Sequence, residues 1–118
     1  MSVSVRIDGD DEARRLLHST GSRLEEAMKG AIAETAINIE RNAKHFAPVD
    51  TGRLRASIGK SFDDDRLGAE VSANTEYAEY VEYGTTRAVA QPFMGPALDH
   101  ARDDFRDIVF KHARRVIG

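Results

Sequence analysis

The side chains with the most versatile chemistry in this sequence are its four histidines, which can bind metal ions or transfer protons near neutral pH. They lie far apart, at His18, His45, His100 and His112, and no two of them have the four-residue spacing that places two ligands on one helix face. The chain also has no cysteine, which excludes thiolate zinc sites, disulfides and thiol nucleophiles. The sequence therefore predicts no metal site.

A catalytic triad can be assembled on paper from Asp50, His45 and Ser57. A nucleophilic serine normally lies on a sharp, glycine-flanked turn, whereas Ser57 lies in a segment that alternates like a strand. Residues 84–87 begin with glycine but lack the glycine spacing and the lysine of a phosphate-binding loop. We therefore expect no enzymatic activity and no cofactor. The alternative, a small hydrolase that uses Asp50 and His45, requires these two side chains to meet in a pocket.

Three consecutive aspartates at 63–65 could coordinate calcium. A calcium-binding loop needs alternating oxygen ligands, a central glycine and a closing glutamate, and the sequence around these aspartates lacks that pattern. We therefore expect the acidic run to be the solvated tip of a hairpin.

Three short segments differ from the generic composition of the rest of the chain. Residues 47–58 contain an Asp-Thr-Gly turn, in which Gly52 can adopt a positive φ. Residues 77–85 contain three of the eight aromatic residues, all of them tyrosines, which tolerate half-buried positions at interfaces. Residues 91–98 form a stiff, apolar start to a helix. The simplest alternative is that all three segments are turns and core corners of one small domain.

Arg53 in the first segment and Glu82 in the second carry opposite charges. A guanidinium group pairs well with a carboxylate, and a buried pair would fix the loop that follows. We therefore expect a salt bridge between these two side chains.

The composition is that of an ordinary folded protein, with 41% hydrophobic and 31% charged residues over 118 positions. This length predicts one domain that spans residues 1–118. The formal net charge of −3 differs from the excess of positive charge that a free duplex-binding domain carries. No stretch approaches the roughly 20 consecutive apolar residues of a membrane helix, and the N-terminus lacks the apolar core of a signal peptide. We therefore expect a soluble chain without a cleavable signal.

The strands are predicted from apolar residues at every second position. This pattern runs through residues 1–7, 54–62 and 67–73, and the last two segments flank the acidic run at 63–65. We therefore expect a short first strand followed later by a hairpin, whose two strands share one apolar face.

The helices are predicted from apolar spacings of three and four. A long helix is expected over 24–46, ended by Pro48, and an amphipathic helix over 93–116. A further helix should start near Asp10, and a short helical piece that ends at Gly84 should precede a loop at 85–91. Together these elements predict an α+β fold, in which a small, largely antiparallel sheet packs against a long central helix and a C-terminal amphipathic helix.

The three unusual segments resemble the motifs of a tailed-bacteriophage family of small neck or tail-completion proteins, also described as minor tail components or head-tail joining proteins. The resemblance rests on three motifs in order: Pro-Val-Asp-Thr-Gly-Arg-Leu-Arg-Ala-Ser-Ile at 48–58, Tyr-Ala-Glu-Tyr-Val-Glu-Tyr-Gly-Thr at 77–85 and Gln-Pro-Phe-Met-Gly-Pro-Ala-Leu at 91–98. It extends over nearly the whole chain. The structural and interface residues that it implies are Asp50, Thr51, Gly52, Arg53, Leu54, Tyr77, Tyr80, Val81, Glu82, Tyr83, Gly84, Thr85, Pro92, Phe93, Met94, Pro96, Ala97 and Leu98.

The resemblance implies a structural virion protein at the head-tail junction, made in the host cytoplasm, that assembles into a ring for which sixfold symmetry is expected. Its partners would be further copies of itself and neighbouring connector, head-completion, tail-terminator or tail-tube proteins, while DNA would only pass through the lumen. Residues 48–95 have a charge balance of −3, which would let DNA slide past without sticking. Gly95 departs from the family, which more often has a larger or basic residue there, and this is expected to loosen the start of the last helix.

Two other functions stay open at this point. Within the same connector region, the protein could instead be a tail terminator or a head-closure protein. A small DNA-binding module is a different class of function, and it would use the basic residues Arg53, Arg55, Lys60 and Arg87.

Overall fold

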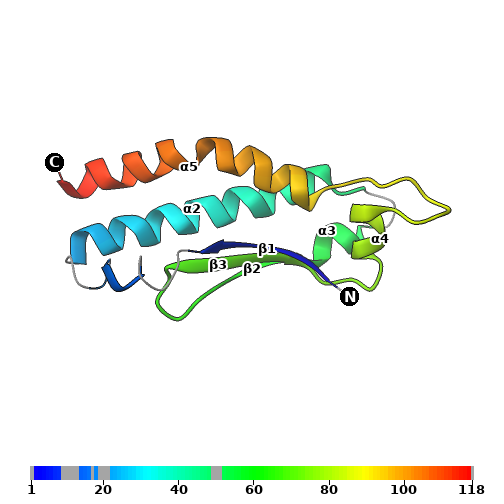
Figure 1. Ribbon diagram of the computed structural model, residues 1–118, viewed down its shortest axis with the longest axis horizontal. Helices are drawn as coiled ribbons and strands as arrows, with labels where there is room; N and C mark the ends of the chain where they lie inside the picture. The colour runs from blue at the N-terminus through cyan, green and yellow to red at the C-terminus, as the bar shows by residue number, and fades with distance from the viewer. Residues whose placement is uncertain (1, 9–13, 17, 19–21, 49–51, 118) are drawn as a thin grey trace.

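The computed structural model describes residues 2–8, 14–16, 18, 22–48 and 52–117. The chain forms an elongated body of 53 × 24 × 20 Å (Figure 1). One layer is a three-stranded antiparallel sheet made of β1 (Val3–Asp8), β2 (Ile58–Phe62) and β3 (Gly68–Ala73), in the spatial order β1-β3-β2. The predicted α+β fold and the antiparallel character of the sheet are thus confirmed.

The sheet has one apolar face and one polar face, because side chains alternate along each strand. Val3, Val71 and Ala73 are buried, whereas Ser4 and Arg6 are exposed. The register places Arg6 opposite Glu70 on the polar face, and the two side chains pair across the strands at 3.5 Å. The apolar face is the one that the helices must cover.

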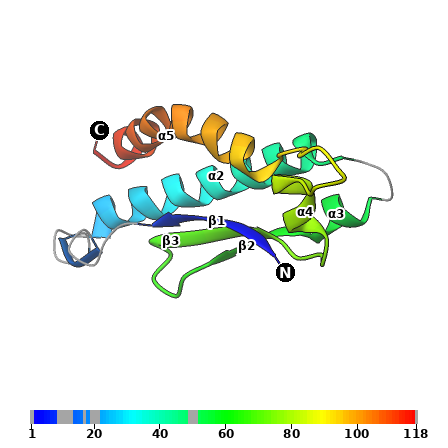
Figure 2. The same ribbon diagram turned by 45° about the vertical axis from the view of Figure 1, so that its right-hand side comes forward.

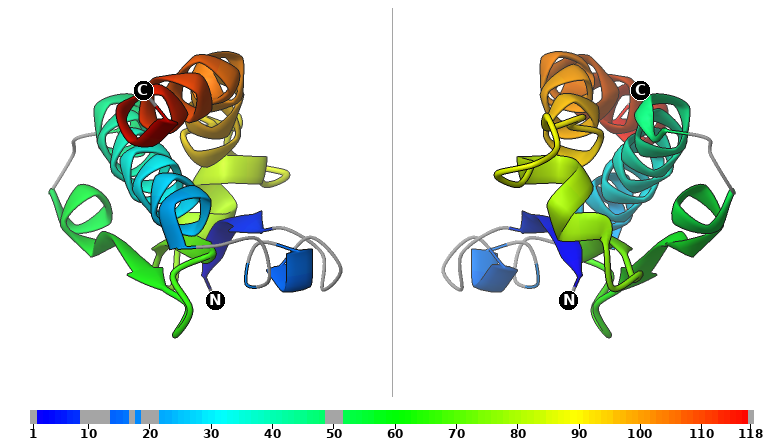
Figure 3. Two further views of the ribbon diagram at one scale, coloured as in Figure 1. Left: turned by 90° about the vertical axis from the view of Figure 1, so that its left-hand side faces the viewer. Right: turned by 90° about the vertical axis from the view of Figure 1, so that its right-hand side faces the viewer.

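Helix α2 (Ser22–Phe46) covers that face, and helix α5 (Met94–Ile117) packs along α2 in the opposite direction (Figure 2). The buried side of α2 is rich in small residues, which let α5 and the sheet approach its backbone closely. Figure 3 shows α5 and β1 on the same side of α2. The buried residues of α2 are Ala27, Ala31, Ile32, Thr35, Ala36, Ile39 and Ala43.

The predicted strand over 54–62 is wrong in its first half. Residues 53–57 form a short helix, α3 (Arg53–Ser57), and only Ile58–Phe62 pairs in the sheet. Gly52 precedes α3 in the left-handed conformation, with φ 78°, and Ser57 donates a hydrogen bond to the Leu54 carbonyl. Leu54 and Ile58 are both buried, four residues apart, which fits one turn of helix as well as it fits a strand.

The other predicted elements occur close to their predicted bounds. Helix α4 (Ala78–Tyr83) ends at Gly84, and residues 84–93 form an irregular loop before α5. Residues 14–16 and 18 are helical, while the predicted helix start near Asp10 lies outside the described residues. None of the helices in the described part of the chain is long and apolar enough to cross a membrane.

Candidate functional site

The centre of the candidate site is the carboxylate of Glu82, which is 7% exposed and lies on α4. Its Oε1 accepts hydrogen bonds from the backbone amides of Phe93 at 3.0 Å and Met94 at 2.8 Å, and its Oε2 accepts one from Gly95 at 3.1 Å. The first amides of a helix have no partner within the helix and favour negative charge. Glu82 therefore caps the start of α5 from another element.

Gly95 makes room for this cap. A Cβ atom at Gly95 would lie 3.2 Å from Oε2 of Glu82, closer than most real contacts of that kind. The amide of Gly95 is one of the three that bind the carboxylate, and the expectation that glycine at this position loosens the start of the last helix stays a prediction.

The expected salt bridge between Arg53 and Glu82 is wrong. Glu82 is buried against backbone amides, whereas the exposed Arg53 pairs loosely with Glu76 at 3.8 Å. The guanidinium of Arg53 also lies 5.5 Å from the centre of the Tyr77 ring, in reach of a cation–π contact. Arg53 and Tyr77 thus link the first and second sequence motifs on the surface.

The loop between α4 and α5 is held in shape by its own hydrogen bonds. The Thr85 hydroxyl accepts from the amides of Arg87 and Ala88, and the Thr85 amide donates to the Ala88 carbonyl at 2.9 Å. The Gln91 amide donates to the Val81 carbonyl at 2.8 Å, which closes the base of the loop. The loop is therefore built to present its tip in one conformation.

Three large apolar side chains are exposed on α4 and this loop: Tyr80 at 50%, Tyr83 at 71% and Val89 at 87%. We call α4 together with residues 84–91 the tyrosine knob. It lies at one end of the elongated body, where the loop projects beyond α4 (Figure 1). Exposed apolar side chains on a rigid scaffold are characteristic of protein-binding surfaces.

The remaining residues of the second and third motifs are mainly structural. Phe93 and Met94 are almost fully buried in the core, and Ala97 is buried next to them, whereas Pro92 is exposed. Val81 and Leu98 pack half-buried against that core. Pro96 lies in the first turn of α5, where its missing amide hydrogen costs nothing.

Of the first motif, Leu54 is buried in the core and Gly52 adopts the predicted positive φ. Asp50 and Thr51 lie outside the described residues, so the pair of Asp50 and His45 is not described either. His45 itself is exposed, with its ring against that of Phe46. Among the described residues, no group of three or more histidine, cysteine, aspartate or glutamate side chains is arranged to hold a metal ion.

An ionic cluster that the sequence does not predict surrounds the hairpin tip. Arg14 donates to Asp8 at 2.6 Å and to Asp63 at 2.7 Å, and it pairs with Asp65 at 3.2 Å. The Arg14 guanidinium holds the pKa of Asp63 below its usual value, while the backbone amide of Leu67 and then Arg14 do the same for Asp65. The prediction of a solvated tip is therefore correct only for Asp64, which is exposed.

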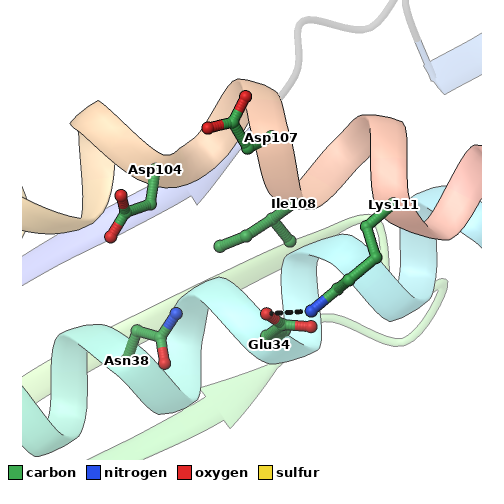
Figure 4. Close-up of a pocket in the computed structure, with 6 residues that line it drawn as sticks. All are labelled: Glu34, Asn38, Asp104, Asp107, Ile108 and Lys111. Atoms are coloured by element: carbon green, nitrogen blue, oxygen red, sulfur yellow. Dashed lines mark hydrogen bonds and ion pairs between the residues drawn. The ribbon is translucent and has the colours of Figure 1, made fainter.

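A shallow groove between α2 and α5 is the other polar feature (Figure 4). Glu34 on α2 accepts from Lys111 at 2.7 Å and lies 2.9 Å from Nε2 of His112, both on α5. These contacts, that of Lys111 foremost, lower the pKa of the Glu34 carboxyl. The contacts of Glu34 in this groove link α2 to α5. The acidic side chains Asp104 and Asp107 are exposed on the rim of the groove.

Comparison with known families gives one match. Residues 8–84, from the end of β1 to the end of α4, match the model of the HK97-gp10-like family, described as "Bacteriophage HK97-gp10, putative tail-component". The chain belongs to this family. The resemblance seen in the sequence motifs is thereby confirmed, and the chain is a structural component related to the phage tail, which contacts other virion proteins. No curated protein and no solved structure gives a significant match.

The match includes the first motif, the second motif up to Gly84 and half of the tyrosine knob, residues 78–84. It ends at Gly84, so the loop tip, the third motif and all of α5 lie beyond it. Glu82 is thus a matched residue that caps a helix outside the matched region.

Proposed function

We propose that this tail component is a non-enzymatic ring subunit of the head-tail junction, acting in the neck or in tail completion. The observation that carries the proposal is the tyrosine knob, with Tyr80, Tyr83 and Val89 exposed on a loop and helix that internal hydrogen bonds hold in place. A surface that is already ordered loses little conformational entropy when it binds, so it suits repeated contacts in an assembly. Further copies of the chain and adjacent connector or tail proteins are its partners.

The charges of the chain favour a ring through which DNA passes. They do not favour a protein that binds DNA tightly. Of the four basic residues considered for DNA binding, Arg55 donates to the Lys44 carbonyl and Lys60 pairs with Glu40 at 3.1 Å. Arg53 pairs with Glu76 at 3.8 Å, and Arg87 is exposed on the loop. With a net charge of −3, the chain has little positive charge to offer to phosphates.

The test is the mass of the purified protein, measured alone and after mixing with tail particles or with capsids that carry a connector. We expect a monomer in isolation and rings, in the sixfold case six copies, on one of the two particles. Electron microscopy of the mixture then locates the ring. Failure of the protein to bind either particle, together with its absence from mature virions, would overturn the proposal.

A further inference from the structure

A cleft of about 390 Å³ runs along the side of the molecule, between the edge strand β1 and helix α5. Its larger part is apolar, and α2 closes it at the back. Phe105 and Leu98 on α5 and Ile7 on β1 are only half-buried there, so the cleft exposes hydrophobic surface that nothing in the described chain covers. The apolar residues that line it are Ile7, Ile39, Leu98, Ala101 and Phe105.

The rim of the cleft carries positive charge on its α5 side. Arg102 and Arg106 lie one helical turn apart on this rim, and both are exposed. Arg102 has only a loose pair with Asp99 at 3.9 Å, and Arg106 lies over the ring of Phe110. Arg6 and Asp8 also line the cleft, but Arg6 is engaged with Asp63 at 2.7 Å and Asp8 with Arg14 at 2.6 Å. Arg102 and Arg106 therefore supply the charge that a ligand of the cleft would meet.

The tyrosine knob has the apolar, aromatic and acidic side chains that complement this apolar cleft with its basic rim. Its tip residue Val89 is an isolated apolar side chain of a size that fits a cleft lined by phenylalanine and leucine. Tyr80 and Tyr83 present aromatic rings, on which arginine guanidinium groups stack well. Glu76, just before α4, and Glu79, on α4, add two carboxylates to the same end of the molecule.

We propose that the tyrosine knob of one copy docks in the β1–α5 cleft of the next copy. This rests on the proposed ring function and adds to it the two surfaces that meet. The knob is at an end of the body (Figure 1), whereas the cleft lies between β1 and α5 along its side, so the contact joins two different patches. A contact between different patches repeats from copy to copy and closes into a ring where the rotation between copies closes, whereas a two-fold contact stops at a dimer.

The absence of cysteine from the chain allows a direct test by disulfide cross-linking. Val89→Cys is combined with Arg102→Cys in one variant and with Arg106→Cys in another, and each is oxidised on the particles that bind the protein. Since a disulfide forms only between closely approaching side chains, we expect a ladder of dimers, trimers and higher species in at least one of the two variants. Mixing the single variants should give dimers only.

The matched control combines Val89→Cys with Ser61→Cys, an exposed position on the opposite edge strand, β2. This control and Val89→Cys alone should give no ladder. If rings form but neither rim position cross-links to residue 89, the docking assignment is wrong and the ring function stands. If the particles carry no copies of the protein at all, the ring function fails instead.

Charge exchange provides a second readout that does not depend on disulfide geometry. The double change Arg102→Glu with Arg106→Glu should reduce incorporation into rings by about tenfold or more, because like charges then face each other across the contact. Adding Glu79→Arg should recover part of that loss, as expected of side chains that interact directly. Unchanged incorporation of the double variant would overturn the proposal.

Discussion

The carboxylate of Glu82 connects two elements that the sequence separates by ten residues of loop. It binds the amide of Phe93, just before α5, and the first two amides of α5, and in doing so it fixes the direction in which that helix leaves the tyrosine knob. Hydrogen bonds to a charged acceptor are each worth roughly 1.5–3 kcal/mol, and buried donors left without a partner cost as much again. A single side chain thus has a large share in the stability of this end of the molecule.

Replacing Glu82 by glutamine tests how much the carboxylate contributes to the stability of the fold. The amide group of glutamine keeps the shape but exchanges one acceptor oxygen for a donor, which would face an amide of α5. We expect the free energy of unfolding to fall by about 2–3 kcal/mol, measured by urea denaturation. Glu76→Gln, at an exposed position just before α4, is the matched control and should change stability by less than about 0.5 kcal/mol. Equal effects of the two changes would contradict the capping role.

Glu34 contributes a pH-dependent link between α2 and α5. Its pKa in the folded protein is lowered by Lys111 and then His112, so the folded state binds a proton at this carboxyl less readily than the unfolded chain does. The contact therefore stabilises the fold at pH values above the unfolded pKa of about 4.3, and this stabilisation is lost as the pH falls through the lower, folded pKa.

We expect Glu34→Gln to flatten the loss of stability on acidification, measured by urea denaturation at pH values from about 6 down to about 3. At neutral pH the change should cost up to about 1 kcal/mol, because the pair is partly exposed. Asp107→Asn, on the rim of the same groove, should keep the pH profile of the unaltered chain. A profile for Glu34→Gln that is as steep as before would show that other carboxylates account for it.

At the scale of elements, two glycines set the ends of helices. Gly52 and Gly84 have φ values of 78° and 80°, and a Cβ at Gly84 would also approach the Ala90 amide nitrogen to 2.8 Å. We expect Gly84→Ala to lower the free energy of unfolding by about 2–3 kcal/mol and Gly52→Ala by about 1 kcal/mol. Gly59→Ala, in β2 with open space around the new atom, should change it by less than about 0.5 kcal/mol, and a different ranking in thermal denaturation would refute the argument.

The elements that the sequence predicts well are those with a long, regular pattern. Helix α2 repeats its apolar spacing over 25 residues, so neither end effects nor single substitutions can hide it. Helix α3 has five residues, and the buried pair Leu54 and Ile58 fits both a helical turn and an alternating strand. Only the left-handed conformation of Gly52, just before α3, distinguishes the helical turn from the strand, and a backbone angle is not visible in a sequence.

The location of the candidate site could be predicted from the sequence, whereas the partners of its side chains could not. Its location in the tyrosine segment follows from composition, since clustered tyrosines are unusual in so small a chain. The partner of Glu82 could not be predicted, because opposite charge favours Arg53 while the actual donors are backbone amides, which every residue but proline has. The cluster of Arg14 with Asp63 and Asp65 was hidden in a similar way, as its members are about 50 residues apart.

At the scale of the whole molecule, changes to the exposed surface should impair assembly without lowering the stability of the fold. Tyr83→Ser combined with Val89→Ser removes two exposed apolar side chains, so we expect the free energy of unfolding to change by less than about 1 kcal/mol. Incorporation into particles should nevertheless fall strongly, as measured by the amount of protein that co-sediments with them. Ile37→Ser, an exposed change on α2, is the control and should affect neither property. Normal incorporation of the double variant would exclude the tyrosine knob as a binding surface.

The loop of the tyrosine knob is fastened at both ends, by the Gly84 amide on the Tyr80 carbonyl and by the Gln91 amide on the Val81 carbonyl. Because these bonds lie outside its tip, a foreign peptide spliced in after Ala88 would lengthen the loop without pulling on either helix, and each doubling of loop length costs only about 0.6 kcal/mol. We expect such a chimera to keep its melting temperature within a few degrees. Because the insert would separate Ala88 from Val89 at the proposed contact, the chimera should fold normally and yet no longer enter the particles.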